Sequence, residues 1–169
     1  MKKVSIQKAF DKFKPETCVF VISADKAGKP NGMVAAWKTR CSVEPPLFAV
    51  ALSKEGNTQR LIREIKEFVI AVPNKELQKY VDFFGGKSGV KVDKFKASKI
   101  ETEKAKFVKL PLISKATMNL ECRLVREINC GDHFMFIGKI LAAYINKNKK
   151  VLYYCGRGTK RGKRTYVEI

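Results

Sequence analysis

The segment at residues 31–58, NGMVAAWKTRCSVEPPLFAVALSKEGNT, changes character twice within a short run. It opens on an Asn-Gly turn pair and continues over 33–43 as an apolar, small-residue stretch that predicts a strand. Two prolines at 45–46 end this strand, because proline cannot donate a backbone hydrogen bond to a sheet. A second buried strand is expected over 47–52. The chain must therefore place two strands on either side of a sharp break.

A polar loop follows the second strand and leads into a helical pattern with its apolar residues on one face. A loop with glycine and hydroxyl residues at a helix N-terminus is a typical seat for a phosphate, because free N–H groups and the positive end of the helix dipole point there. Lys54 and Thr58 would add a positive charge and a hydroxyl. The sequence thus predicts a phosphate site at 53–58.

Three residues before the proline break have a suitable size for a flat ligand. Ala35 and Ala36 leave room for a ring against the strand backbone, and Trp37 could border it. Alternating small and apolar residues also make an ordinary buried strand, and any one of these elements taken alone is structural more often than not.

The length and composition favour one domain over 1–169 with a real core, since 45% of its 169 residues are hydrophobic. No apolar run approaches the roughly 20 residues of a membrane helix, and the basic N-terminus lacks the apolar region of a secretory signal. The five cysteines form no C-x-x-C pair and accompany a single histidine, so a zinc site is not expected. The simplest explanation of the five cysteines is that they are reduced thiols in a cytoplasmic protein.

The charge is strongly basic, with 35 Lys and Arg against 16 Asp and Glu, a formal net charge of +19. This balance favours phosphate-bearing partners and would support non-specific nucleic-acid binding. The basic residues are spread along the chain, however, and the densest run lies at 157–164. A solvated, extended basic tail over 158–169 is the simplest interpretation of that run.

The remaining pattern is dominated by short strands separated by turns, with few helices. It predicts a mainly β fold, a closed antiparallel barrel with helical excursions. The expected helices cover 6–13, 75–84 (capped by Asn74) and part of 92–97 within a polar excursion at 87–109. The expected strands cover 18–23, 68–72, 116–128, 133–145, 151–155 and 165–169, with a hairpin turn at 129–132.

The ordered pattern N-x-M-x-A-x-W, C-S-V, Pro-Pro and L-S-K in this segment resembles the flavin reductase-like, FMN-binding split-barrel family. The resemblance implies an antiparallel, Greek-key split barrel that binds FMN. Val34 and Ala36 stand where many relatives carry hydroxyl residues, which leaves backbone N–H groups to bond the flavin there. The residues that the resemblance places at the flavin are Asn31, Met33, Val34, Ala35, Ala36, Trp37, Thr39, Cys41, Ser42, Ser53, Lys54, Asn57 and Thr58.

A later segment, F-F-G followed by S-G and D-K-F, also resembles the family and lies where its flavin site is found. It adds Phe84, Ser88, Gly89 and Lys94 as candidate cofactor contacts. A helix C-terminus followed by a surface loop explains the same residues almost as well. We interpret Cys41 as a small residue packed under the ring and not as a redox partner.

The tripeptide Gly131-Asp132-His133 matches a G-D-H sequence that in related reductases lies where the nicotinamide cofactor docks. Taken alone, it is an ordinary hairpin turn. Its position after the flavin segments makes nicotinamide docking the stronger interpretation.

Three functions follow from these patterns. The first is an NAD(P)H-dependent reductase that passes hydride to FMN and then electrons to free flavin, a ferric complex or a protein; the cofactors supply the chemistry and no catalytic side chain is required. The second is a flavoredoxin-like FMN electron carrier reduced by a protein partner. The third is a basic, nucleic-acid-binding β-barrel, which we place last. The resemblance further implies a homodimer with the flavin near the subunit interface, and no membrane partner is expected.

Overall fold

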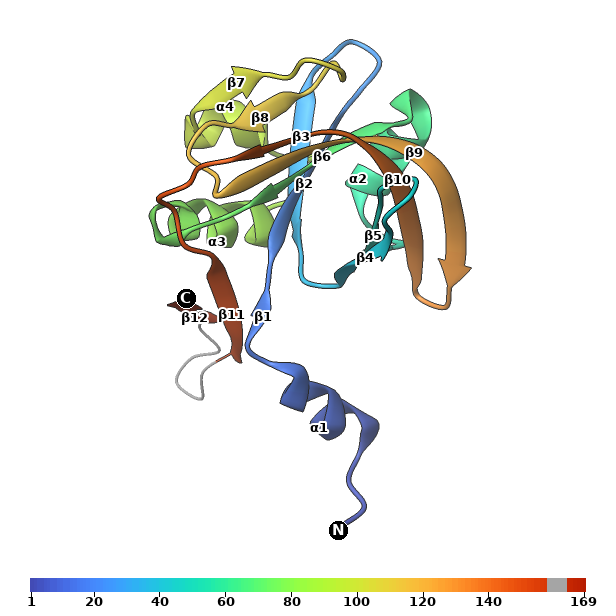
Figure 1. The fold of residues 1–169 in the computed structure, drawn as a ribbon, viewed down its shortest axis with the longest axis vertical. Helices are drawn as coiled ribbons and strands as arrows, with labels where there is room; N and C mark the ends of the chain where they lie inside the picture. The colour runs from blue at the N-terminus through green and yellow to red at the C-terminus, as the bar shows by residue number, and fades with distance from the viewer. Residues whose placement is uncertain (158–163) are drawn as a thin grey trace.

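The computed structural model describes residues 1–157 and 164–169 and contains one large antiparallel sheet that curls on itself (Figure 1). Its seven strands are ordered β3-β2-β6-β9-β10-β5-β4, and every neighbouring pair is antiparallel. The predicted mainly β, antiparallel fold is confirmed. The strands are β2 (Val19–Ala24), β3 (Pro30–Ala35), β4 (Lys38–Ser42), β5 (Leu47–Ser53), β6 (Glu67–Val72), β9 (Met118–Cys130) and β10 (His133–Ile145).

Two smaller sheets and most of the helices lie around this barrel, while α1 lies on an arm that extends away from it (Figure 1). A three-stranded sheet joins both ends of the chain, in the order β1-β11-β12, and β7 pairs with β8. The helices are α1 (Ile6–Phe10), η1 (Asp11–Phe13), α2 (Asn57–Ile65), η2 (Lys75–Leu77), α3 (Gln78–Gly86) and α4 (Lys94–Ser98). The remaining strands are β1 (Glu16–Thr17), β7 (Thr102–Lys104), β8 (Pro111–Ile113), β11 (Leu152–Arg157) and β12 (Arg164–Glu168).

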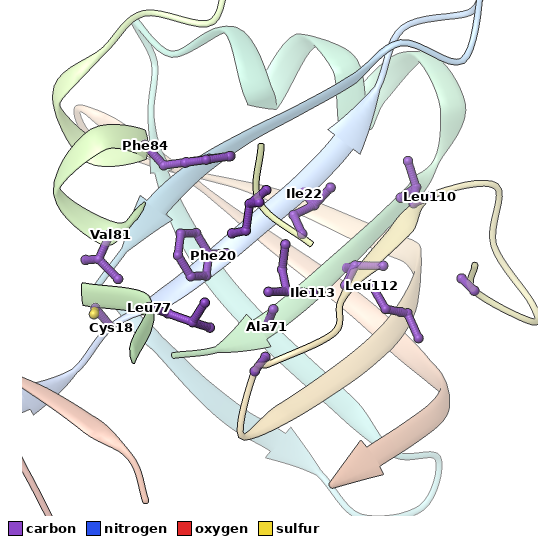
Figure 2. Packing of buried hydrophobic residues seen from close by; sticks show 14 of the residues in the cluster. Cys18, Phe20, Ile22, Ala71, Leu77, Val81, Phe84, Leu110, Leu112 and Ile113 are labelled. Carbon is purple, nitrogen blue, oxygen red and sulfur yellow. The ribbon is translucent and has the colours of Figure 1, made fainter. Parts of the chain in front are cut away.

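Strand β2 is buried along its whole length, which explains why its sequence VFVISA is apolar almost without alternation. Val19 and Val21 face one core cluster, formed with β5, β6, β9 and β10. Phe20 and Ile22 face the other, beneath η2 and α3. Figure 2 shows this second cluster, where Phe20 meets Phe84 edge-on with ring centroids 5.5 Å apart.

The predicted strand at 33–43 is wrong as a single element. β3 ends at Ala35 and β4 begins at Lys38, because β3 pairs with β2 while β4 pairs with β5 at the other edge of the sheet. Ala36 and Trp37 make the crossing, and the Ala51 N–H donates to the Trp37 carbonyl at 2.9 Å. The break therefore leaves Trp37 outside the strands, with 55% of its surface exposed.

Two further expectations differ from the structure. Asn74 does not cap its helix: its amide donates to the Lys115 carbonyl at 2.6 Å, and the 3-10 turn η2 precedes α3. In the expected basic tail at 158–169, residues 158–163 lie outside the described part of the chain. The rest is not an extended tail, since β12 pairs with β11 and Tyr166 donates to the Asp82 carboxylate at 2.9 Å.

A buried carboxylate holds the long excursion against the barrel. Glu121 on β9 has no exposed surface and accepts hydrogen bonds from the N–H groups of Lys106 (2.9 Å), Phe107 (2.6 Å) and Val108 (2.9 Å). The Tyr144 hydroxyl donates a fourth at 2.6 Å. Burial by itself raises the pKa of the Glu121 carboxyl, but these four bonds outweigh it and the pKa is lowered. The carboxylate stays ionised and holds the 106–108 backbone in place.

Candidate functional site

The loop after β5 has the geometry expected of an anion site. Gly56 is the N-cap residue of α2, so no side chain there accepts from the first turn, and the first turn carries no acidic residue. The N–H groups at the start of α2 and the positive end of its dipole are therefore available to an anion. Lys54 is exposed on the same loop, with its Nζ 4.9 Å from the centre of the Phe134 ring.

Asn31 connects this helix start to β3 and to the 88–93 loop. Its amide donates to the Thr58 hydroxyl at 3.1 Å, and both side chains are buried. A Cβ built on Gly89 would lie 1.9 Å from Asn31 Oδ1, so only glycine lets the loop backbone approach this closely. Three separate segments thus form one groove of about 240 Å³, whose lining includes Lys29, Asn31, Asn57, Arg60, Gly89 and Asp93.

The G-D-H turn lies directly beside the same loop. His133 pairs with Ser53 across β10 and β5, and the Lys54 N–H donates to the Asp132 carbonyl at 3.1 Å. The His133 ring packs against Trp37 with centroids 4.7 Å apart and planes tilted by 42°. Its Nδ1 lies 2.8 Å from Asp132 Oδ1, and this hydrogen bond lowers the pKa of the Asp132 carboxyl. The helix start, the turn and Trp37 consequently share one surface.

Successive side chains of β3 point to opposite faces of the sheet. The residues expected at the flavin ring therefore do not all lie on one face. Met33 and Ala35 pack on the core cluster that contains β5 and β10, whereas Val34 packs on the cluster beneath α3. Val34 and Ala36 also line a small pocket of about 130 Å³ with Tyr166. A flat group along β3 would meet one of these two faces and not all four side chains.

The β4 residues expected at the flavin lie on an edge strand. Thr39 and Cys41 are exposed and Ser42 is half-buried. The Thr39 hydroxyl donates to the Arg40 carbonyl at 3.0 Å, and the Cys41 thiol is free. Packing of Cys41 under a ring stays a prediction, and its side chain is accessible for such a contact.

Two predicted contacts lie inside the fold and away from this surface. Phe84 is fully buried in the core, and Lys94 is only 3% exposed. The Lys94 ammonium donates to the carbonyls of Gly32 and Phe84, each at 2.8 Å, which ties β3 to α3. Burial lowers the pKa of Lys94 to about 8. Ser88 is exposed, and its hydroxyl accepts from the Val90 N–H at 3.4 Å.

Sequence reasoning missed two residues at the start of α2. Arg60 donates to Asn57 Oδ1 at 3.1–3.2 Å and lines the groove. Gln59 is 5% exposed and donates to the Lys54 carbonyl, while its Oε1 has no partner among the described residues. The i, i+3 spacing of Asn57 and Arg60 on one helix face could have identified Arg60. No comparable spacing in the sequence pointed to Gln59, whose side-chain amide is buried at the start of α2.

The residues at this surface fit a flavin mononucleotide. The α2 N-terminus with Lys54 and Arg60 suits a phosphate, and the unpaired Gln59 oxygen suits a hydroxyl donor such as a ribityl group. Among the described residues, no group of three or more His, Cys, Asp or Glu is placed to hold a metal ion. None of the helices in 1–157 and 164–169 is long and apolar enough to cross a membrane.

Known proteins resemble this chain in both sequence and structure. The flavin reductase like domain matches residues 15–163. An uncharacterized protein of Archaeoglobus fulgidus is 43% identical over 113 residues, covering 67% of this chain and 64% of that protein. The chain thus spans slightly less than two thirds of that relative. A ferric-chelate reductase (NAD(P)H) of the same organism is 25% identical over 138 residues, which cover 80% of each protein.

Among solved structures, flavoredoxin of Desulfovibrio vulgaris (Miyazaki F) superposes with a TM-score of 0.80. The two sequences are 26% identical, and the match covers 92% of this chain and 87% of flavoredoxin. The expected split-barrel architecture is thereby confirmed.

Proposed function

The chain belongs to the flavin reductase-like family of flavoproteins, and from that premise we propose that it binds FMN and transfers hydride to it from NAD(P)H. One observation carries the proposal: the Lys54 N–H to Asp132 carbonyl bond joins the anion site at α2 to the turn that carries His133. A cofactor phosphate and a nicotinamide would then lie on the same surface. When bound, FMN supplies the hydride chemistry, and the protein binds, orients and excludes water.

The phosphate assignment favours FMN, because the chain has no G-x-G-x-x-G dinucleotide loop. The first-turn N–H groups of α2, Lys54 and Arg60 would hold the phosphate, while Asn31 and Thr58 fix the helix start. Ala36 and Trp37 would border the ring.

Replacing Lys54 with Ala should weaken FMN binding about tenfold and leave riboflavin binding unchanged, because only FMN carries the phosphate. Calorimetric titration of both flavins into the flavin-free protein measures the difference. Lys139→Ala removes the same charge from an exposed position on β10 and serves as the control. Equal weakening of both flavins by Lys54→Ala would contradict the phosphate assignment.

The second part of the proposal is that Gly131, Asp132 and His133 dock the nicotinamide. Asp132 is exposed and holds the His133 imidazole through the 2.8 Å bond, which orients the ring beside Trp37. The imidazole would hydrogen-bond the cofactor or pack on it, without taking a proton in the hydride step.

His133→Ala should therefore raise the apparent KM for NAD(P)H about tenfold, the effect of one lost polar contact, and leave the FMN content intact. Anaerobic stopped-flow bleaching of the bound flavin by NADH and NADPH measures it. Loss of flavin from the variant would instead place His133 in the flavin shell.

The likeness to flavoredoxin favours a second candidate, an FMN electron carrier reduced by a protein partner. The same bleaching experiment on the unaltered protein decides between the two. A reductase bleaches rapidly with NADH or NADPH, whereas a carrier stays yellow with both. If the protein takes up no flavin at all, both candidates are excluded. The remaining hypothesis is then a basic barrel that binds nucleic acid.

We further propose a homodimer in the cytoplasm, with the flavin near the subunit interface. The support is the apolar side chain of Val43, which follows the edge strand β4 and is 90% exposed. The five free cysteines suit a reducing compartment. Light scattering at several concentrations tests the dimer, and a strictly monomeric holoprotein would refute it.

A further inference from the structure

The N-terminal arm, residues 1–15, extends away from the barrel and buries none of its apolar residues (Figure 1). Phe10 is 55% and Phe13 is 77% exposed. A helix of five residues is not stable by itself in water. The arm is held at its base, where β1 pairs with β11 and the Lys14 ammonium lies 5.7 Å from the centre of the Tyr154 ring.

Between this arm and the barrel lies an open groove of about 880 Å³. Phe10 and Phe13 line the arm side, while Trp37 and Tyr154 line the barrel side. This volume is within the range of pockets that bind small organic molecules, about 300–1,000 Å³. Four aromatic rings around one space suit a planar ligand, since stacked and edge-on contacts with flat rings are favourable.

The groove adjoins the candidate flavin site at Trp37. Ala36 and Trp37 line the groove, and the Trp37 ring also packs against His133, with ring centroids 4.7 Å apart. A ligand in the groove would therefore touch the residue that also borders the proposed flavin.

The charges of the groove distinguish it from the rest of the molecule. The chain as a whole carries +19, but the groove has Lys14 and Lys38 against Asp11 and Glu16. Both ammonium groups already have partners: Lys14 bonds Asp11 at 2.8 Å, and Lys38 donates to the Thr17 carbonyl at 2.5 Å. An anionic ligand would find no surplus positive charge here, in contrast to the exposed Lys54 that precedes α2.

The remaining polar groups on the lining are neutral donors. Gln7 offers a side-chain amide and Tyr154 a hydroxyl, and both suit the carbonyl oxygen of an uncharged ring compound. A quinone combines a planar ring, two carbonyl oxygens and no charge.

We propose that this groove binds an uncharged, quinone-type compound as the electron acceptor of the protein. The acceptor role rests on the proposed function, which brings reducing equivalents to the other side of Trp37. The net change is NAD(P)H + H⁺ + quinone to NAD(P)⁺ + hydroquinone: the nicotinamide is oxidised by loss of hydride, and the second proton comes from solvent.

Equilibrium dialysis of the oxidised, FMN-loaded protein tests the binding without turnover. The probes are 2-(hydroxymethyl)anthraquinone, which is neutral, and anthraquinone-2-carboxylate, which is anionic; neither ring system adds to the exposed thiols. The neutral probe should bind more tightly than the anionic one. Tighter binding of the anion, or no binding of the neutral probe, would overturn the proposal.

Paired variants locate the bound probe. Phe10→Ala with Phe13→Ala should weaken the neutral probe about tenfold, the effect of removing two aromatic contacts. Both side chains are exposed, so the fold should be unaffected. Phe107→Ala removes an exposed ring outside the groove and should change nothing. Unchanged binding in the double variant, or displacement of the probe by excess FMN, would contradict binding of the probe in the groove.

The outcome also separates this proposal from the proposed function. If the protein binds FMN and its flavin is bleached by NADH, but it binds no quinone, the reductase function is retained. The groove is then excluded as the acceptor site. A protein that takes up no FMN removes the reductase, and dialysis then still shows whether the groove binds the neutral probe.

Discussion

Glu121→Ala is expected to lower the free energy of unfolding by about 3–5 kcal/mol, because the N–H groups of residues 106–108, of which that of Val108 is buried, and the Tyr144 hydroxyl lose the acceptor that they share. The N–H groups of residues 106–108 cannot all turn to water while the loop stays in place. Urea denaturation followed by circular dichroism measures the loss. Glu103→Ala, an exposed carboxylate on β7, is the control and should leave the midpoint unchanged.

The pH dependence of this effect has a defined sign. The folded-state pKa of Glu121 is lowered from the usual value of 4.5, so the carboxylate stabilises the fold above that pH. The stabilisation is lost as the pH falls through the lower, folded-state value. The difference between the wild type and Glu121→Ala should therefore be constant near neutrality and shrink in acid. A difference that grows in acid would contradict the charge state assigned here.

Local signals in the sequence were sufficient for most strands. The run VFVISA, the strand after Pro45-Pro46 and the hairpin at 129–132 are found within one or two residues of the predictions. Gly131 has φ 68°, the left-handed conformation that the turn requires and that glycine adopts without strain. Apolar runs and turn residues act over a few positions, so they can be interpreted without the fold.

The strand break at 36–37 could not be found in this way. Ala36 and Trp37 fit the strand pattern on both sides, and the break exists because β3 and β4 pair with different edges of the sheet. That choice of partner is a long-range property. The same break exposes Trp37, which both the proposed flavin site and the groove use.

The sequence motifs give candidate site residues, but side-chain burial decides which of them a ligand can reach. Asn31 and Thr58 meet in a buried hydrogen bond at the start of α2, and the His133 ring packs on Trp37 beside the loop that precedes this helix. Lys94 was expected at the cofactor because the D-K-F segment resembles the family, yet its ammonium group is buried and donates to two backbone carbonyls inside the fold. Phe84 was also expected at the cofactor, but it is a core residue. Its ring packs directly against Gly32, where the glycine leaves room for it. Periodicity alone does not distinguish such positions from a ligand surface.

Gly89→Ala is expected to weaken FMN binding about 30- to 100-fold while the protein remains folded. The added methyl group would lie 1.9 Å from Asn31 Oδ1, so either the 88–93 loop or the Asn31 amide must move. Moving the amide breaks its buried bond to the Thr58 hydroxyl at the start of α2, where the phosphate is proposed to bind. Calorimetric titration of FMN measures the loss. Gly86→Ala is the matched control, since its methyl group meets nothing within 4 Å.

A double variant shows whether the clash is the cause. Asn31→Ala alone removes the bond to Thr58 and should weaken FMN binding by a similar factor. If Gly89→Ala acts only by displacing Asn31, then combining the two changes should be no worse than Asn31→Ala, because the methyl group then has no amide to strike. Additive losses would mean that Gly89 contributes by itself, through its backbone approach to the phosphate. Unchanged FMN affinity in all three variants would place the flavin away from α2 and would contradict the site proposed here.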